Sequence, residues 1–201
     1  MKRKISDALV ALNPLERHFR LAVTYVKRQR EITKSFDKIL GRDWVRITND
    51  AKNPLVIGLG GEDGTMSTNQ KRQLGICACV GTMVEFSDPK GSGEARRAFV
   101  ANLSLNTDKN SRATLDHLYR SLNQSPIKEI LENPRHTKVE ICFDHASNYI
   151  SRNFLYGCTK TICQMYSHIR LIRWAPLAPC HGKTNLDRRF SNFTSWINTY
   201  Q

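Results

Sequence analysis

The sequence predicts an α/β domain with a five-stranded mixed sheet, preceded by a basic helical segment. Three apolar runs follow one another closely, as in antiparallel strands, and two further apolar runs alternate with segments of helical periodicity. Strands separated by helices pair in parallel through crossover connections. The expected order is β-β-β-α-β-α-β-α over residues 49–201, after a helical extension at residues 1–48.

The helical extension carries much of the positive charge, with twelve Lys or Arg against five Asp or Glu in residues 1–48. Asn13-Pro14 is typical of a helix start, because Asn caps a first turn and Pro fits its first position. The outward-pointing cations of this helix are predicted to form a phosphate-binding face or, alternatively, an ordinary solvated face. These cations are Lys27, Arg28, Arg30 and Lys34.

Each element of the domain has its own local signal. The predicted strands are the apolar or alternating runs 55–59, 74–84, 98–105, 137–143 and 169–174. The predicted helices, with apolar residues at helical spacing, are 111–122, 125–131, 154–165 and 184–197. The first predicted strand, Leu55 to Leu59, contains no acidic residue, and Glu62 and Asp63 come just after it.

The composition and net charge limit the kinds of partner that the protein is expected to bind. The chain has 201 residues, a formal net charge of +13 and a pI near 9.7, which favours a polyanionic partner: nucleic acid, or alternatively an anionic membrane surface. No apolar run approaches the roughly 20 residues of a membrane span, and no signal-peptide core follows the basic N-terminus. We therefore expect an intracellular protein, in the nucleus if the source is eukaryotic.

Two polar blocks follow the last two predicted strands. Phe143-Asp144-His145-Ala146-Ser147-Asn148 opens the first, residues 143–156, and His181-Gly182-Lys183-x-x-x-Asp187 lies in the second, residues 178–187. Both resemble blocks of DDE/D transposases, which share the ribonuclease H-like fold with integrases and ribonucleases H. The predicted element order is also that of this fold, so the resemblance implies a ribonuclease H-like sheet.

The resemblance implies phosphodiester cleavage or strand transfer with two Mg²⁺ or Mn²⁺ ions. The implied catalytic and metal-binding acids are Asp63, Asp144 and Asp187. Carboxylates suit Mg²⁺, a hard cation that prefers oxygen ligands and leaves positions open for substrate phosphates. His181, Lys183 and Arg188 would contact nucleic acid, DNA rather than RNA, in a homo-oligomer or larger assembly.

Each implied acid also has a structural interpretation. Asp144 can cap a turn or helix, and Asp187 fits a capping box that begins at Thr184. Asp63 lies in a glycine-rich turn, and in the simplest alignment a glycine occupies the place of the first acid. The six cysteines include no Cys-x-x-Cys pair, so we expect buried thiols and no zinc site.

The sequence is compatible with two functions of different class. The first is a nuclease or strand-transferase domain derived from a mobile element. The second is a catalytically inactive ribonuclease H-like module that binds nucleic acid or acts as an assembly subunit. The acid-free first strand favours the second, and the paired blocks around Asp144 and Asp187 favour the first.

Overall fold

The computed structural model describes residues 2–56, 76–143, 146–176, 186, 189–192 and 195. Its strands are β1 (Trp44–Val56), β2 (Ile76–Ser87), β3 (Ala95–Ser104), β4 (Lys138–Phe143) and β5 (Leu171–Pro176). Its helices are α1 (Lys2–Lys34), α2 (Phe36–Ile39), α4 (Ser111–Leu122), α5 (Ile127–Glu132) and α6 (Arg152–Met165). In this part of the chain, no helix is long and apolar enough to cross a membrane.

The five strands form one mixed sheet in the order β3-β2-β1-β4-β5. The first three pair antiparallel as a meander, and β4 and β5 extend the sheet in parallel to β1. The predicted fold class is therefore confirmed: the protein has the ribonuclease H-like architecture. The consequence for function is that β4 ends at Phe143, beside Asn49 in the middle of β1, and β1 continues beyond it to Val56.

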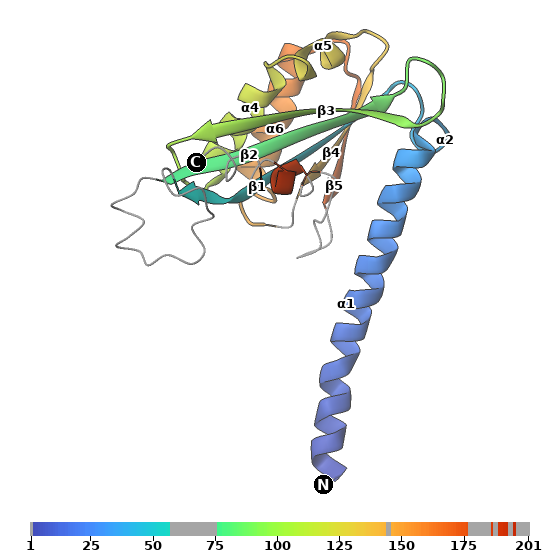
Figure 1. The fold of residues 1–201 in the computed structure, drawn as a ribbon, viewed down its shortest axis with the longest axis vertical. Coiled ribbons are helices and arrows are strands. Elements are labelled where there is room, and N and C mark those ends of the chain that lie inside the picture. Colours follow the sequence, from blue (N-terminus) through green and yellow to red (C-terminus); the bar gives the residue numbers. More distant parts are fainter. Residues whose placement is uncertain are drawn as a thin grey trace.

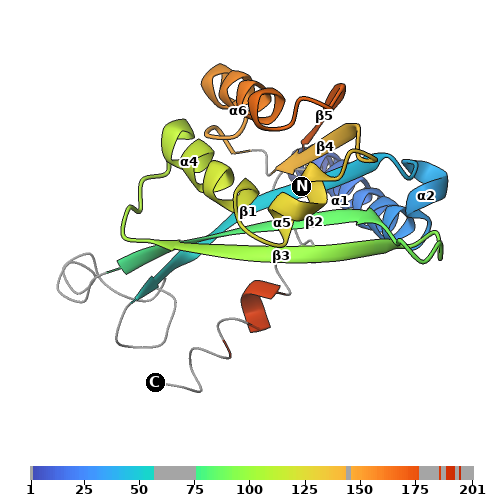
Figure 2. The ribbon, with the colours of Figure 1, turned by 90° about the horizontal axis from the view of Figure 1, so that it is seen from above.

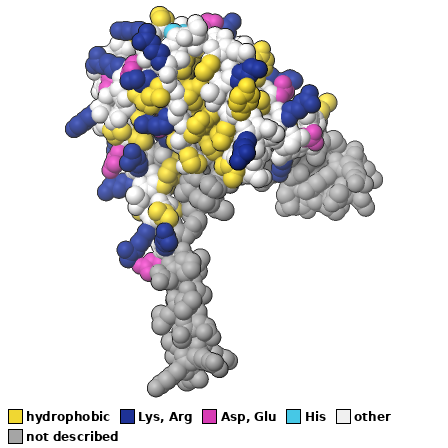
Figure 3. Space-filling view, turned by 180° about the vertical axis from the view of Figure 1, so that it is seen from behind, with side chains coloured by type: hydrophobic (Ala, Val, Ile, Leu, Met, Phe, Trp, Pro, Cys, Tyr) yellow, Lys and Arg dark blue, Asp and Glu magenta, His cyan; other side chains and the backbone are white. Residues whose placement is uncertain are grey.

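Helices α4, α5 and α6 cover one face of the sheet (Figures 1 and 2). The hydrophobic core lies between them, because alternate strand residues point to this side. Val45 and Ile47 of β1 pack there with Ile141 of β4 and with Leu118 and Phe154 of the helices, all almost fully buried. From behind (Figure 3), the body shows hydrophobic side chains in its middle, with Lys and Arg side chains among and around them.

The opposite face, which we call the α1 face, is covered at its two ends by different segments. At the start of β1, Ile32 and Phe36 pack against Trp44. Further along the sheet, Leu186 and Phe190 pack with side chains of β2. The rest of α1 extends away from the body (Figure 1).

One row of charged side chains crosses the α1 face, with one residue from each strand. Its contacts are Arg97 Nε–Glu85 Oε1 at 2.9 Å, Glu85 Oε2–Arg46 Nη1 at 3.3 Å, Arg46 Nε–Glu140 Oε2 at 2.9 Å, and Glu140 Oε1–Arg173 Nη2 at 2.7 Å. All four pairs lie in register across neighbouring strands. Thr33 of α1 donates a hydrogen bond to Glu85, and the three middle residues of the row, Arg46, Glu85 and Glu140, are buried, whereas the row is exposed at both ends. We call these five residues the ionic row.

The structure corrects two predictions about the N-terminal segment. β1 begins at Trp44, well before the predicted strand at Leu55, so residues 44–48 are extended and the predicted boundary between residues 48 and 49 falls inside a strand. The sequence did not predict a strand here because Arg46 is charged, and a charged residue normally indicates an exposed position. The α1 helix also runs through Pro14 instead of beginning there.

Candidate active site

The first strand does contain an acidic residue. Asp50 lies within β1, so the expectation of an acid-free first strand, which placed that strand at Leu55–Leu59, is wrong. Asp50 is half-buried, and its Oδ1 accepts a hydrogen bond from the backbone N–H of Ala51 at 2.8 Å. The alternation Trp44-Val45-Arg46-Ile47-Thr48 was the signal that could have located this strand and its acid.

Asp50 lies on the α1 face, opposite Gly81 of β2. The antiparallel register pairs the two residues directly, so side chains at these positions share one face about 4.5–5.5 Å apart. A Cβ on Gly81 would lie 2.7 Å from Phe190 Cζ and 3.0 Å from Leu186 Cδ1. Gly81 therefore lets the segment with Leu186 and Phe190 pack closely beside Asp50.

The end of β4 reaches the same place from the other side of β1. In the parallel register, Asn49 is the partner of Phe143, the last residue of β4. After β4 the chain returns to β1, because the Tyr149 hydroxyl donates a hydrogen bond to Asn49 Oδ1 at 3.0 Å. The Tyr149 ring also stacks on Phe143, with the ring centroids 6.0 Å apart. The loop after β4 is thus tied to the residue that precedes Asp50.

Asn49 is held rigidly in turn. Its Nδ2 donates to Thr82 Oγ1 of β2 at 2.8 Å, and the Thr82 hydroxyl donates to Ser121 Oγ of α4 at 2.8 Å. All three side chains are buried. A buried polar network with its partners in place fixes side-chain positions. The network therefore connects β1, β2, α4 and the loop after β4 directly beneath Asp50.

Cys142, next to the end of β4, is a protonated thiol. It is fully buried, and burial raises its pKa to about 11. Arg46 Nε lies 3.1 Å from the sulfur, but this neighbouring positive charge does not offset the cost of burying a thiolate. This thiol is therefore not an anionic ligand at neutral pH.

Comparison with known proteins adds little. No protein-family model and no curated protein matches the chain. The solved structures that are similar include LC9-RNase H1, a type 1 RNase H with the type 2 active-site motif, and a pre-cleavage Mos1 transpososome. The first is 14% identical with a TM-score of 0.36, covering 79% of this chain and 74% of its own. The second is 11% identical with a TM-score of 0.39, covering 90% of this chain and 50% of its own.

The chain therefore spans half the length of the matched chain of the Mos1 transpososome. The ribonuclease H-like architecture is defined by the order and direction of the five strands.

The structure describes some of the predicted site residues and not others. Asp63, Asp144, Asp187, His181, Lys183 and Arg188 lie outside the described residues, so their roles stay predictions. Lys27, Arg28, Arg30 and Lys34 are all exposed on α1. Within the described part of the chain, no group of three or more His, Cys, Asp or Glu side chains could hold a metal ion.

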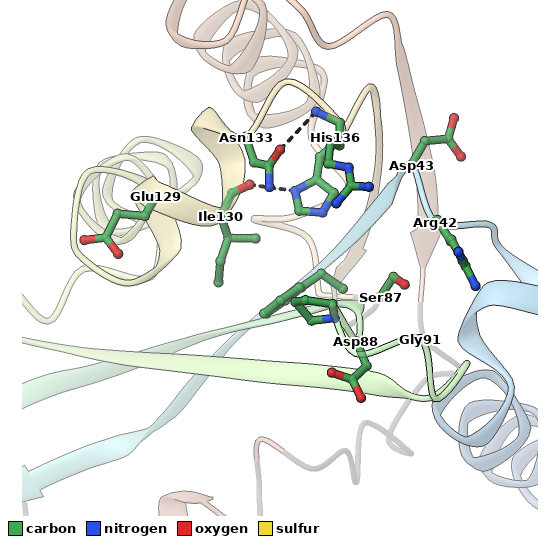
Figure 4. Close-up of a pocket in the computed structure, with 12 residues that line it drawn as sticks. Arg42, Asp43, Ser87, Asp88, Gly91, Glu129, Ile130, Asn133 and His136 are labelled. Atoms are coloured by element: carbon green, nitrogen blue, oxygen red, sulfur yellow. Dashed lines mark hydrogen bonds between the residues drawn. The ribbon is translucent and has the colours of Figure 1, made fainter.

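A pocket lies away from Asp50, around the start of β1 and the end of β2 (Figure 4). Its three acids have partners: Asp43 pairs with Lys138 and Asp88 pairs with Arg96, each at 2.9 Å, and Glu129 accepts a hydrogen bond from the Ser125 hydroxyl at 2.7 Å. His136, which also lines it, is nearly buried and donates its Nδ1–H to the Ile130 carbonyl at 2.7 Å. This pocket offers no carboxylate pair for metal binding, so we place the candidate site at Asp50.

Proposed function

We propose that the protein is a nucleic-acid-processing domain in which Asp50, Asp144 and Asp187 hold divalent metal ions. In this proposal Asp50, not Asp63, is the acid of the first strand. Bound Mg²⁺ or Mn²⁺ would supply activation of the attacking oxygen and stabilisation of the leaving oxygen in phosphodiester cleavage or strand transfer. The three carboxylates offer oxygen donors, which these hard cations prefer.

The observation that carries the proposal is the position of the residues next to the two other acids. Asp144 directly follows Phe143, which is paired with Asn49, and Asp187 directly follows Leu186, which packs over Gly81 beside Asp50. Each acid is therefore joined by a single peptide bond to a described residue. Both neighbours flank Asp50, one on each side of β1.

Basic residues supply the means of binding. Lys27, Arg28, Arg30 and Lys34 are exposed along α1, and none of them has a carboxylate partner among the described contacts. We propose that they contact phosphates of DNA, which would make binding steeply salt-dependent. His181, Lys183 and Arg188 would add contacts near Asp187.

Metal-dependent nicking of a supercoiled plasmid tests the acids. Asp50→Asn should lower the nicking rate at least roughly 100-fold, because loss of a direct ligand should cost no less than loss of its supporting shell. Asp63→Asn should leave the rate near that of the unchanged protein. Asp116→Asn is the matched control, since Asp116 is an exposed acid paired with Arg120 on α4.

Two results would contradict the assignment. Equal nicking by the Asp50→Asn and unchanged proteins would remove Asp50 from the site, and loss in Asp63→Asn alone would restore Asp63 as the first acid. The alternative function, a catalytically inactive module, was supported by a first strand without an acid. That support is lost because β1 contains Asp50. Salt-dependent DNA binding without any nicking in Mg²⁺ or Mn²⁺ would be the result that supports it.

A further inference from the structure

Residues 146–176 form a continuous basic part of the molecule. They comprise the loop after β4, helix α6 and strand β5, and they contain four Lys or Arg but no Asp or Glu. By contrast, α4 and α5 carry acids, some of them in i,i+4 pairs with basic residues. Arg173 pairs with Glu140 in the ionic row, whereas Arg152, Lys160 and Arg170 have no carboxylate partner among the described contacts, which favours a polyanionic ligand there.

On α6, three exposed side chains form one stripe: Arg152, Tyr156 and Lys160. They are spaced four residues apart, which places them on neighbouring turns of one helix side. At 1.5 Å per residue, the two cations lie about 12 Å apart along the helix axis. Tyr156 lies between them and is 71% exposed. The stripe therefore presents an aromatic ring flanked by positive charges.

The packing of α6 holds this stripe outward. Phe154, Cys158 and Ile162 on the other side of the helix are fully buried in the core. Gly157 packs against Leu115 of α4, so α6 cannot rotate without losing both contacts. The exposure of Tyr156 is thus imposed by the fold, and α6 lies on the side of the molecule far from β3 (Figure 2).

The stripe begins after the loop that follows β4, whose last residue is paired with Asn49 of β1. The loop that leads into α6 contains Tyr149, which is hydrogen-bonded to Asn49. Ser151 caps α6 by accepting a hydrogen bond from the Phe154 N–H at 3.1 Å, and Arg152 is the first residue of the helix. Asp50 itself lies on the α1 face and α6 on the opposite face, so a nucleic-acid strand that contacts both would pass around the end of β4.

We propose that α6 binds an unpaired segment of nucleic acid, with Tyr156 stacking on a base and Arg152 and Lys160 contacting phosphates. An exposed tyrosine between cations matches single strands better than duplexes, because an unpaired base offers a free π-face. The proposal rests on the proposed function for the nature of the partner. It does not rest on catalysis, because binding can be measured without metal.

Fluorescence anisotropy with a labelled 15-mer of oligo-dT, in EDTA, tests this contact in the full chain. Tyr156→Ala should weaken binding by roughly 5- to 100-fold, the usual contribution of one stacked base. Tyr156→Phe should bind like the unchanged protein, because the ring remains. Tyr119→Ala is the matched control, since Tyr119 is also exposed but lies on α4, next to acidic Asp116.

The phosphate contacts of Arg152 and Lys160 are tested separately, through the salt dependence of binding. The double variant Arg152→Ala/Lys160→Ala should lower the slope of log affinity against log salt by about 1.4, or 0.7 for each lost phosphate contact. The affinity of Tyr156→Ala for a matched duplex should be unchanged. Thermal unfolding of each variant checks the fold, which the exposed positions of these side chains should leave intact.

The outcomes separate this inference from the proposed function. If Tyr156→Ala and Tyr119→Ala bind oligo-dT equally, α6 is not the contact surface, whatever the plasmid assay gives. If the stripe variants lose binding to an acidic peptide but not to oligo-dT, the partner is a protein and the inference is wrong. If they lose oligo-dT binding while the Asp50→Asn variant retains it, the inference stands independently of the metal site.

Discussion

Arg46 Nε lies 2.9 Å from Glu140 Oε2, and both side chains are almost entirely buried between the sheet and α1. Arg46 also contacts Glu85 on its other side, so a single guanidinium joins β1 to both of its neighbouring strands. Charges are buried in proteins when they are paired, because an isolated ion in a poorly solvated interior is costly. The pairing therefore makes Arg46 the centre of the ionic row.

Replacing Arg46 with Leu should lower the free energy of unfolding by about 3–5 kcal/mol, since it leaves buried carboxylates without their partner. Urea denaturation measures this loss. Arg120→Leu is the control, because Arg120 forms an exposed pair with Asp116 that should contribute at most about 1 kcal/mol. Equal losses in the two variants would contradict a central role for the buried pair.

Tyr149→Phe should remove the hydrogen bond to Asn49 and leave the ring in place. We expect the free energy of unfolding to fall by about 1 kcal/mol, the usual value for one such bond. If the proposed site is correct, the Mg²⁺ concentration for half-maximal nicking should also rise, because the loop after Asp144 is less firmly held. Tyr119→Phe, at an exposed position on α4, should change neither quantity.

Gly81→Ala should disturb the packing of Phe190. The added methyl group would lie 2.7 Å from Phe190 Cζ, closer than atoms in contact can lie, and overpacking of this kind costs about 1–3 kcal/mol. Adding Phe190→Leu should recover part of the loss by removing the ring. A double variant no more stable than Gly81→Ala would show that the contact with Phe190 is not the cause.

Mild acid should destabilise the protein partly through His136. Burial lowers the pKa of this imidazole, although its hydrogen bond to Ile130 and the more distant Asp43 act in the opposite direction. Between the folded pKa and the ordinary value of about 6.5, the unfolded chain therefore binds a proton that the folded protein does not. The stability that His136 contributes is present above pH 6.5 and is lost as the pH falls through this window.

Urea denaturation at a series of pH values from 7.5 downward checks this prediction. His136→Gln should show a smaller fall in the free energy of unfolding than the unchanged protein. Some fall should remain, because burial also lowers the pKa of His117. Identical pH profiles for the variant and the unchanged protein would exclude His136 as a source of the acid sensitivity.

The sequence predicted those elements that bury one apolar side. β4 and α4 were located closely, because alternation and helical spacing show directly in their residues. β1 was missed because Arg46 is buried, and the acids that neutralise it, Glu85 and Glu140, come from strands far along the chain. Hydropathy along one segment cannot reveal such pairing, which depends on the assembled sheet.

Because the first strand was predicted at the wrong residues, the first acid of the candidate site was also predicted wrongly. With the strand expected at Leu55, Asp63 was the nearest acid, and Asp50 was assigned no role. The sequence alone also could not predict that Gly81 makes room for Phe190 beside Asp50. That role depends on the cross-strand register of Gly81 with Asp50 and on its contact with Phe190. From the sequence alone, Tyr156 could not be distinguished from a core aromatic, because its exposure depends on how α6 packs against α4.

Helix α1 gives the molecule an elongated shape in solution. Its 33 residues form a rod about 50 Å long, and only its C-terminal part packs on the body. A compact chain of 201 residues would have a radius of gyration of about 17 Å. The protein should therefore tumble more slowly, and scatter as a larger particle, than a sphere of the same mass.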